Sequence, residues 1–136
     1  MTQNLNFSSI LLRFFQMESE KRKTKIVILG AGSFGHAMAH ISSHNSTNEV
    51  VIYVRNKVVC DYINKNHINP KRFKDTPLPP NIVACNYIKE AVKGATILVH
   101  AIPTKPTKRF FQENLKHFPK GVYYLSTCKG IIVETH

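Results

Sequence analysis

The sequence of 136 residues has no tryptophan and only three cysteines, Cys60, Cys85 and Cys128. The cysteines are odd in number, widely spaced and without a Cys-x-x-Cys pair, so neither a disulfide framework nor a zinc site is indicated. Long hydrophobic runs are missing too, because Arg13 interrupts the longest one near the N-terminus and a membrane-spanning helix needs roughly 18 or more apolar residues. These absences favour a protein of a reducing compartment without a transmembrane segment.

Acidic residues are scarce: eight Asp and Glu stand against 19 Lys and Arg, giving a net charge of +11. The positive electrostatic field of such a chain attracts anions, including phosphates, nucleic acid and acidic lipid. The net charge therefore indicates a class of partner rather than a fold. With 43% hydrophobic and 20% charged residues, disorder over the whole chain is excluded. The length fits a single domain, since domains take about 100–200 residues.

The first 24 residues differ from the rest. Their apolar residues recur at helical spacing, at Phe7, Ile10, Leu11, Phe14 and Phe15. No acid precedes Glu18, so an organelle-targeting helix for a plastid or mitochondrion is one interpretation. One arginine is thin support for a transit peptide, and the favoured interpretation is a poorly ordered extension, or a stretch upstream of a true start at Met17. We expect a cytoplasmic protein with a domain over 25–136, and an organelle as the alternative location.

From Lys25 onwards, apolar strands alternate with amphipathic helices. A continuous apolar run at 26–29 predicts a strand buried on both faces, and strands are also predicted over 49–54, 82–84, 96–101 and 122–125. Helices are predicted between them, the later ones over 88–92 and 107–117, and a proline-rich loop at 70–80. This alternation is typical of βαβ units, so we predict an α/β fold with a doubly wound parallel sheet, a Rossmann-like domain.

The first two helices of this domain have apolar stripes that predict which side is buried. In the first, the stripe consists of Phe34, Ala37, Met38 and Ile41. In the second, it consists of Val58, Val59, Tyr62 and Ile63.

A glycine-rich turn, residues 30–35, follows the first strand and has the Gly-x-Gly-x-x-Gly pattern of dinucleotide-binding proteins. Gly30 permits the tight turn, Gly32 lets backbone approach a pyrophosphate, and Gly35 lets the helix pack against the strand. The following helix presents N–H groups and partial positive charge to the phosphates. Because the motif lies between a buried strand and an amphipathic helix, it predicts a site for NAD, with NADP as the alternative.

The residue that meets the adenosine end of the cofactor is expected about 20 residues after this motif. An acid there holds the ribose 2′-hydroxyl, whereas an arginine accommodates a 2′-phosphate. Twenty residues beyond Gly35 lies Arg55, and the nearest acids are Glu49 and Asp61. Arg55 is therefore the candidate, with a solvated surface arginine as the alternative.

Three other features each have a functional and a plainer interpretation. The histidines His36, His40 and His44 recur every four residues, but they lie opposite the predicted apolar stripe, so we expect solvent-exposed side chains and no metal site. His100, at a strand end, is expected to be a packed or hydrogen-bonded histidine rather than an acid or base. The basic clusters 21–23 and 71–72, the latter followed by Phe73, resemble a nucleic-acid footprint, although solvated loops explain them as well.

Several segments between Lys25 and the C-terminus resemble, in order and spacing, the NAD(P)-dependent glycerol-3-phosphate dehydrogenases of the bacterial type. They are Gly-Ala-Gly-Ser-Phe-Gly at 30–35, Ile63-Asn64, Asn-Pro-Lys-Arg-Phe at 69–73, Leu78-Pro79, Asn81-Ile82, Ala-Ile-Pro-Thr at 101–104 and Ser-Thr-Cys-Lys-Gly-Ile at 126–131. Departures are Cys128, where the family usually has Thr, and Lys105, where it often has Gln. The resemblance implies the cofactor-binding domain of an oxidoreductase that interconverts dihydroxyacetone phosphate and sn-glycerol 3-phosphate.

The resemblance also implies roles for individual residues. Ser33 and Phe34 line the cofactor pocket, and Arg55 meets the adenosine end. Lys129 touches both cofactor and substrate; independently, its place after the last strand suits an ammonium that holds a phosphate, with an ordinary surface lysine as the alternative. The family's general acid/base lysine and most substrate contacts belong to a helical C-terminal domain absent from this chain. We therefore expect no catalytic residue here, no activity from the chain alone and a homodimer in the full-length enzyme. A non-catalytic nucleotide-binding or nucleic-acid-associating module is the alternative function.

Overall fold

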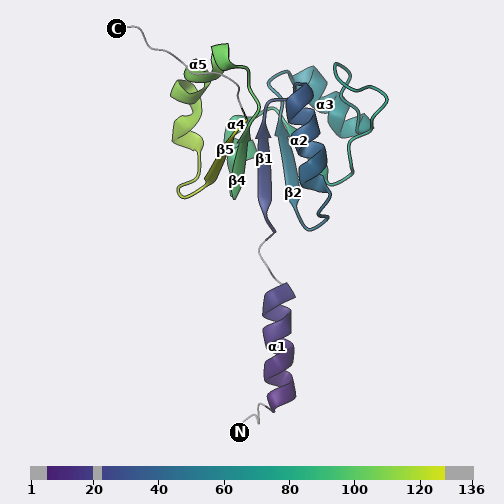
Figure 1. Cartoon of the computed structure of the whole chain (residues 1–136), viewed down its shortest axis with the longest axis vertical. Helices are drawn as coiled ribbons and strands as arrows, with labels where there is room; N and C mark the ends of the chain where they lie inside the picture. The colour runs from purple at the N-terminus through teal and green to yellow at the C-terminus, as the bar shows by residue number, and fades with distance from the viewer. Residues whose placement is uncertain (1–5, 20–22, 128–136) are drawn as a thin grey trace.

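The computed structural model describes residues 6–19 and 23–127 and has a five-stranded parallel sheet as its centre (Figure 1). Its strands are β1 (Lys25–Leu29), β2 (Glu49–Tyr53), β3 (Ile82–Cys85), β4 (Ile97–His100) and β5 (Tyr123–Ser126). They lie in the order β3-β2-β1-β4-β5, and every neighbouring pair is parallel. The sheet confirms the predicted doubly wound Rossmann-like fold, in which the order of the strands reverses between β1 and β4.

Helices cover both faces of the sheet (Figure 1). One face packs against α2 (Ser33–Ser43) and α3 (Lys57–Asn66) around Ile28, Ile52 and Ile63, which are at most 1% exposed. The other face packs against α4 (Ile88–Val92), with Phe110 of α5 (Thr104–Asn114) at its margin. The predicted continuous apolar run of β1 is buried from both sides, because Ile26 and Ile28 face one layer while Val27 and Leu29 face the other.

The predicted buried stripe of α2 is wrong at three of its four positions, and only Met38 is partly buried against the core. Phe34, Ala37 and Ile41 are exposed, whereas the side that meets the sheet carries Gly35, His36, Ala39 and Ser43. The cause is the close contact of Gly35 with the turn after β1, which requires the helix to present its small residues to the strands. His36 lies one position from Gly35 and is therefore 3% exposed rather than solvent-exposed as predicted.

The helix α3 also differs in part from its predicted face. Val59 and Ile63 are buried as expected, but Val58 and Tyr62 are exposed. The third buried residue of the helix is Cys60. The Asn56 side chain accepts a hydrogen bond from the Val59 N–H and so fixes where the helix begins.

Two element boundaries near the C-terminus differ from expectation as well. Helix α5 begins at Thr104, three residues earlier than predicted, because a proline at position 106 is tolerated in the first turn. A 3₁₀ turn over Leu115–His117 follows α5.

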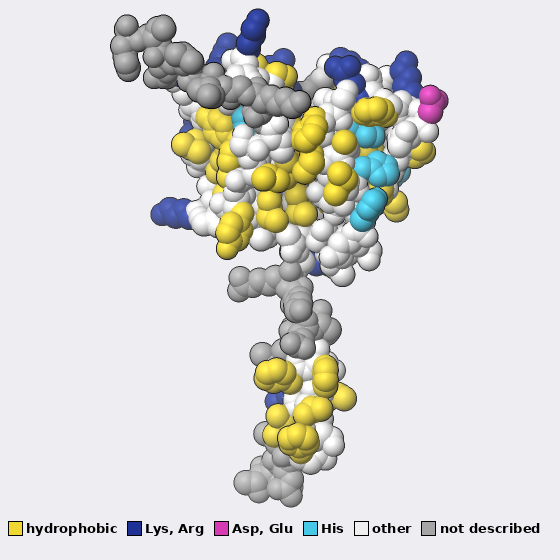
Figure 2. All heavy atoms as spheres, viewed as in Figure 1, with side chains coloured by type: hydrophobic (Ala, Val, Ile, Leu, Met, Phe, Trp, Pro, Cys, Tyr) yellow, Lys and Arg dark blue, Asp and Glu magenta, His cyan; other side chains and the backbone are white. Residues whose placement is uncertain are grey.

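The N-terminal segment forms helix α1 (Phe7–Ser19), which Figure 1 shows apart from the sheet. Its phenylalanines Phe7, Phe14 and Phe15 are exposed, and Figure 2 shows hydrophobic side chains on its surface. The predicted helical periodicity is therefore present. Among the helices described, none combines the length and hydropathy that a membrane crossing requires.

Candidate functional site

The glycine turn joins β1 to α2 at the carboxyl end of the sheet. Gly30 has φ of +115°, a left-handed conformation that side chains rarely adopt, and a Cβ there would lie 2.9 Å from the Ala101 carbonyl oxygen. A Cβ on Gly35 would collide with the carbonyl oxygen of Gly30. These two glycines therefore let the turn, the helix and the end of β4 approach one another closely.

Gly32 differs from the other two glycines. It is the N-cap of α2, has φ of −71°, and has no atom within 4 Å of where a Cβ would lie. The first N–H groups of a helix have no partner inside the helix, and the N-cap residue of α2, Gly32, has no side chain that could accept from them. The turn therefore leaves open space in front of a helix N-terminus, the arrangement that accepts phosphate oxygens.

An open cleft of about 1120 Å³ lies along this edge of the sheet. Its walls come from the glycine turn, the end of β2, the segment after β4 and helix α5. Residues that line it include Gly30, Gly32, Ser33, Phe34, Tyr53, Arg55, Arg72, Pro103, Thr104, Arg109 and Thr127. The cleft is located where the strand order reverses between β1 and β4, which is where open parallel sheets bind their ligands.

Cations dominate the charged groups of the cleft. Arg109 and Glu113 are both on α5 and form an ion pair of 2.7 Å. Arg55 and Arg72 have no ion-pair partner within the described part of the chain. Tyr53 contributes a phenol whose pKa is raised by burial, partly offset by the charge of Arg55. The cleft therefore suits an anionic ligand with an aromatic part.

A loop between α3 and β3 is tied to the glycine turn. The side-chain amide of Asn69, which is 2% exposed, donates a hydrogen bond of 3.0 Å to the Ala31 carbonyl oxygen. The ring of Phe73 packs on His36 with centroids 5.0 Å apart. Sequence reasoning missed Asn69 and Arg72 as site residues, because only the folded loop brings them to the turn. Phe73 itself does not line the cleft.

His100 is a packed, hydrogen-bonded residue, as expected. It is 2% exposed, its Nδ1 is paired with the Tyr124 hydroxyl, and its Nε2 lies 3.0 Å from the Thr107 hydroxyl. The Thr107 hydroxyl in turn donates to the Pro103 carbonyl oxygen. Burial lowers the pKa of His100. Its role is to join β5 to the start of α5 beside the cleft.

The predicted site residues fall into three groups. Gly30, Gly32, Ser33, Phe34 and Arg55 line one cleft, while Gly35 supports it from the helix side. Lys129 and the neighbouring Cys128 lie outside the described residues. Within residues 6–19 and 23–127, no three His, Cys, Asp or Glu side chains form a group that could hold a metal ion.

The sequence matches one protein-family model over residues 25–136, described as the N-terminus of NAD-dependent glycerol-3-phosphate dehydrogenase. The chain belongs to this family. The match confirms the resemblance drawn from the sequence and favours a dehydrogenase over a nucleic-acid-associating module.

Individual relatives agree with the family match. The chain is 36% identical over 116 residues to "Glycerol-3-phosphate dehydrogenase [NAD(+)] 2, chloroplastic" of Arabidopsis thaliana, covering 85% of this chain and 28% of the relative. It is 32% identical over 112 residues to "Glycerol-3-phosphate dehydrogenase [NAD(P)+]" of Streptococcus uberis, covering 82% of this chain and 33% of the relative. The chain thus spans about a third or less of these relatives, whose names differ in the cofactor they give.

Solved structures of this family have the same fold. The glycerol-3-phosphate dehydrogenase of Plasmodium falciparum aligns with a TM-score of 0.76 at 27% identity, over 89% of this chain and 36% of that one. The glycerol-3-phosphate dehydrogenase of Saccharomyces cerevisiae aligns with a TM-score of 0.74 at 25% identity, over 80% of this chain and 34% of that one. These alignments confirm the dinucleotide-binding architecture assigned from the strand order.

Proposed function

We propose that this chain is the cofactor-binding part of an oxidoreductase that interconverts dihydroxyacetone phosphate and sn-glycerol 3-phosphate with NAD(P)H. The observation that carries the proposal is the open space at Gly32, in front of the uncapped N-terminus of α2, within a cationic cleft. The residues present fit a dinucleotide: a pyrophosphate needs backbone N–H donors without side chains in the way, and Gly32 leaves that volume empty. Family membership supports the same conclusion.

In this proposal, the bound cofactor supplies the hydride, and the residues of the chain position it. The N–H groups of Ser33 and Phe34 begin α2 and face the phosphates. Arg55, two residues beyond the end of β2, meets the adenosine end. The part of the cleft near Pro103 and Thr104, at the carboxyl edge of the sheet, would hold the nicotinamide. Lys129 is proposed to touch both the cofactor and the substrate phosphate.

Cofactor binding is tested by calorimetric titration of the folded chain with NADH and NADPH. Saturable binding of at least one of them is the expected result. Absence of heat with both, for a chain whose circular dichroism shows the α/β fold, would overturn the proposal. Titration with a DNA duplex at physiological salt separates the alternative function, because a nucleic-acid module would bind it through its excess of cations.

The reaction itself is tested on the native protein purified from its source. Addition of dihydroxyacetone phosphate should start the oxidation of NADH or NADPH. If the protein bound the dinucleotide but did not oxidise it when dihydroxyacetone phosphate was added, its substrate would be a different compound.

Two further expectations join this proposal. We propose a homodimer for the full-length enzyme, which analytical ultracentrifugation of the native protein tests directly. We also propose a cytoplasmic location, with a plastid or mitochondrion as the alternative; chloroplastic relatives and the apolar face of α1 support the alternative. Fluorescent fusions with and without residues 1–24 distinguish the two locations.

A further inference from the structure

The loop between α3 and β3 meets the glycine turn at one buried side chain. Asn69 is 2% exposed, and its amide bridges two backbone groups. Its Nδ2 donates to the Ala31 carbonyl oxygen at 3.0 Å, and its Oδ1 accepts from the Lys71 N–H at 3.0 Å. A carbonyl oxygen only accepts and an N–H only donates, so these two partners determine which end of the amide faces the turn. Asn69 is therefore a fixed donor to the backbone of the turn.

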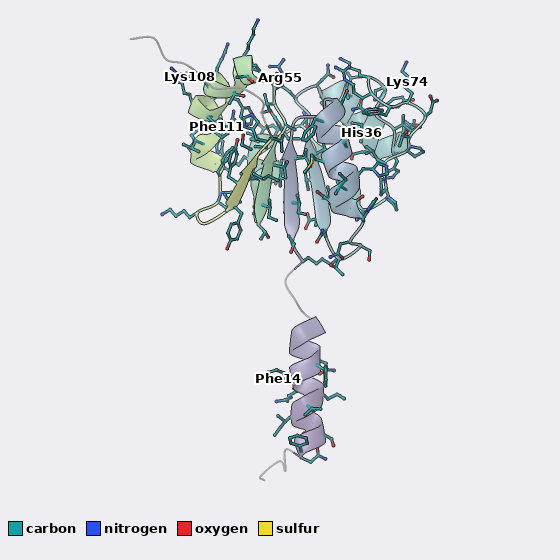
Figure 3. The ribbon with its side chains drawn as sticks, in the orientation of Figure 1. Phe14, His36, Arg55, Lys74, Lys108 and Phe111 are labelled. Atoms are coloured by element: carbon teal, nitrogen blue, oxygen red, sulfur yellow. The ribbon has the colours of Figure 1, made fainter. Side chains whose placement is uncertain are left out.

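The rest of this loop is held against α2. The ring of Phe73 packs on His36, and the Pro77 carbonyl oxygen lies 3.1 Å from Nε2 of His40. Figure 3 shows Lys74, the next residue of the loop, on the same side of the molecule as His36. None of these residues lines the cleft. The loop therefore has its own support outside the cleft, and it holds Asn69 against the turn from behind.

The hydrogen bond from Asn69 fixes the direction of one peptide group. The peptide bond between Ala31 and Gly32 is trans, so the Ala31 carbonyl and the Gly32 N–H point in opposite directions. Because the carbonyl is bonded to Asn69, the N–H points away from the loop. Gly32 lines the cleft, whereas Asn69 does not. Within residues 6–19 and 23–127, no protein group accepts a hydrogen bond from the Gly32 N–H. This donor is therefore available on the cleft side of the turn.

Glycine at position 32 makes such a hydrogen bond necessary. Glycine adopts positive and negative φ about equally well, and no atom lies within 4 Å of where a Cβ of Gly32 would be. The peptide plane before it can therefore rotate at little steric cost. The reversed plane would present the Ala31 carbonyl oxygen to the cleft, where its partial negative charge would repel a phosphate. The same rotation breaks the hydrogen bond to Asn69, so Asn69 stabilises the orientation that presents the N–H.

We propose that Asn69 is a positioning residue for the cofactor, which keeps the Gly32 N–H directed at the pyrophosphate by donating to the Ala31 carbonyl oxygen. The inference rests on the proposed function and adds to it a residue that acts through the backbone without touching the cofactor. An N–H donor that is already oriented binds a charged phosphate oxygen without a further ordering cost. Loss of the Asn69 donor should therefore lower the affinity of the folded chain for dinucleotide.

The test is Asn69→Asp, which keeps the size of the side chain and the acceptor for the Lys71 N–H. An ionised carboxylate cannot donate to the Ala31 carbonyl oxygen and repels it, whereas a protonated carboxyl group can donate to it. Relative to the wild type at the same pH, dinucleotide affinity should fall about tenfold or more at about pH 8. At about pH 5.5 it should recover to within about threefold of the wild type.

Calorimetric titration measures these ratios with NADH or NADPH, whichever the wild type binds more tightly. Circular dichroism at each pH establishes that wild type and variant are folded. A side chain that only stabilised the fold would leave the affinity ratio of the folded proteins independent of pH. An Asn69→Asp variant with wild-type affinity at about pH 8 would overturn the inference.

Asn81→Asp is the matched control. The Nδ2 of Asn81 donates to the carbonyl oxygen of Ser43, the last residue of α2, at 3.1 Å. Both substitutions thus remove an amide donor to a backbone carbonyl at one end of α2, and both should lower the stability of the domain. Asn81→Asp should nevertheless change dinucleotide affinity by less than about threefold at either pH. Equal losses of affinity in the two variants would overturn the role of Asn69.

A second variant, Asn69→Leu, applies if the aspartate variant does not fold. Leucine places no charge in the buried position and cannot donate at any pH. Its dinucleotide affinity should therefore be about tenfold or more below that of the wild type at both pH values. Wild-type affinity in this variant would also overturn the inference.

A measurement on the wild type needs no substitution at position 69. The chain has six glycines, so glycine-selective ¹⁵N labelling gives few amide signals, and the signal of Gly32 is the one missing from the spectrum of Gly32→Ala. Addition of the dinucleotide should shift this signal because its N–H gains a phosphate acceptor. A Gly32 signal that stays in place at saturation would show that this N–H does not face the pyrophosphate, and the inference would fail.

The wild-type titrations keep this inference separate from the proposed function. A wild type that binds neither NADH nor NADPH refutes the proposed function itself. A wild type that binds dinucleotide, together with variants at Asn69 and Asn81 that behave alike, refutes only the positioning role and leaves dinucleotide binding intact.

Discussion

Gly35 lies so close to the carbonyl oxygen of Gly30 that a side chain at position 35 would collide with it. This contact sets the rotation of α2, because the residues that share the face of Gly35 must also be close to the strands. Ala39 and Ser43 follow at successive turns and are buried, and the adjacent His36 is buried with them. Phe34 is turned outward to the cleft by the same rotation.

The first prediction concerns this contact. Gly35→Ala should destabilise the domain by about 1–3 kcal/mol, because the collision is with backbone, which moves only if β1 and α2 separate. Urea unfolding followed by circular dichroism measures the change. Gly32→Ala is the matched control. Position 32 has an ordinary φ and open space around it, so the urea midpoint of this variant should stay close to that of the wild type. Equal losses in both variants would contradict the proposed packing role.

The second prediction separates binding from folding at the same turn. Gly32→Val should fold like the wild type, since no atom lies within 4 Å of the new Cβ, but its side chain would fill the volume that the pyrophosphate needs. We expect dinucleotide affinity to fall at least tenfold, about 1.4 kcal/mol or more. Calorimetric titration with NADH and NADPH measures it. Unchanged affinity would mean that the cofactor does not pass in front of α2.

The strands could be predicted because parallel strands covered on both faces are continuous apolar runs, and Ile26 to Leu29 is such a run. The glycine turn could be predicted because its backbone geometry requires glycine, as the φ of Gly30 shows. Both features depend on a few consecutive residues. Local sequence is sufficient for features of this kind.

The face of α2 and the role of the loop after α3 could not be predicted, since both depend on contacts across the fold. The apolar spacing of Phe34, Ala37 and Ile41 pointed to the wrong side, because close packing at Gly35 outweighs hydrophobic periodicity. Arg72 reaches the cleft only because Asn69 hydrogen-bonds to Ala31, 38 positions earlier in the chain. The family resemblance named Ser33, Phe34 and Arg55, which line the cleft, but assigned no role to Arg72, which lines it too.

The third prediction tests the role of Arg55 itself. Arg55→Asp would repel a 2′-phosphate and offer an acceptor to a 2′-hydroxyl, so NADPH affinity should fall about ten- to a hundredfold while NADH affinity changes little. Parallel titrations of wild type and variant with the two cofactors give the ratio. Equal losses for both would make Arg55 a stacking or structural residue, and no change for either would make it an ordinary solvated arginine.

The fourth prediction is that this polypeptide of 136 residues, purified alone, binds cofactor without turning over dihydroxyacetone phosphate. Reduction of the carbonyl needs a proton donor beside its oxygen. His100, the last residue of β4, is buried and hydrogen-bonded to Tyr124 and Thr107. A spectrophotometric assay with NADH and NADPH measures turnover. Activity that survives purification would require a proton donor among the residues of this chain. Lys105 and Lys129 would then be the first residues to substitute in order to find it.

The fifth prediction concerns acid stability. Burial lowers the pKa of His36, with a smaller contribution from the charge of His40, and burial also lowers the pKa of His100. A histidine whose pKa is depressed on folding binds fewer protons in the folded state than in the unfolded state. Stability is therefore complete above the ordinary pKa of 6.5 and falls as the pH decreases below it, until the folded-state pKa is passed. Thermal midpoints measured between neutral and acidic pH should show this decline.

A substitution at His36 isolates its share of that decline. Both ring nitrogens of His36 are buried without a hydrogen-bond partner, and Phe73 covers the ring, so a phenyl group suits the same position. His36→Phe should keep or raise the thermal midpoint at neutral pH and lose less of it on acidification than the wild type does. His44→Gln, at the exposed end of the same helix, is the matched control and should retain the wild-type decline. If His36→Phe declined as steeply as the wild type, protonation of His36 would not limit the stability of the loop and helix that it joins, and His100 would be the residue to substitute next.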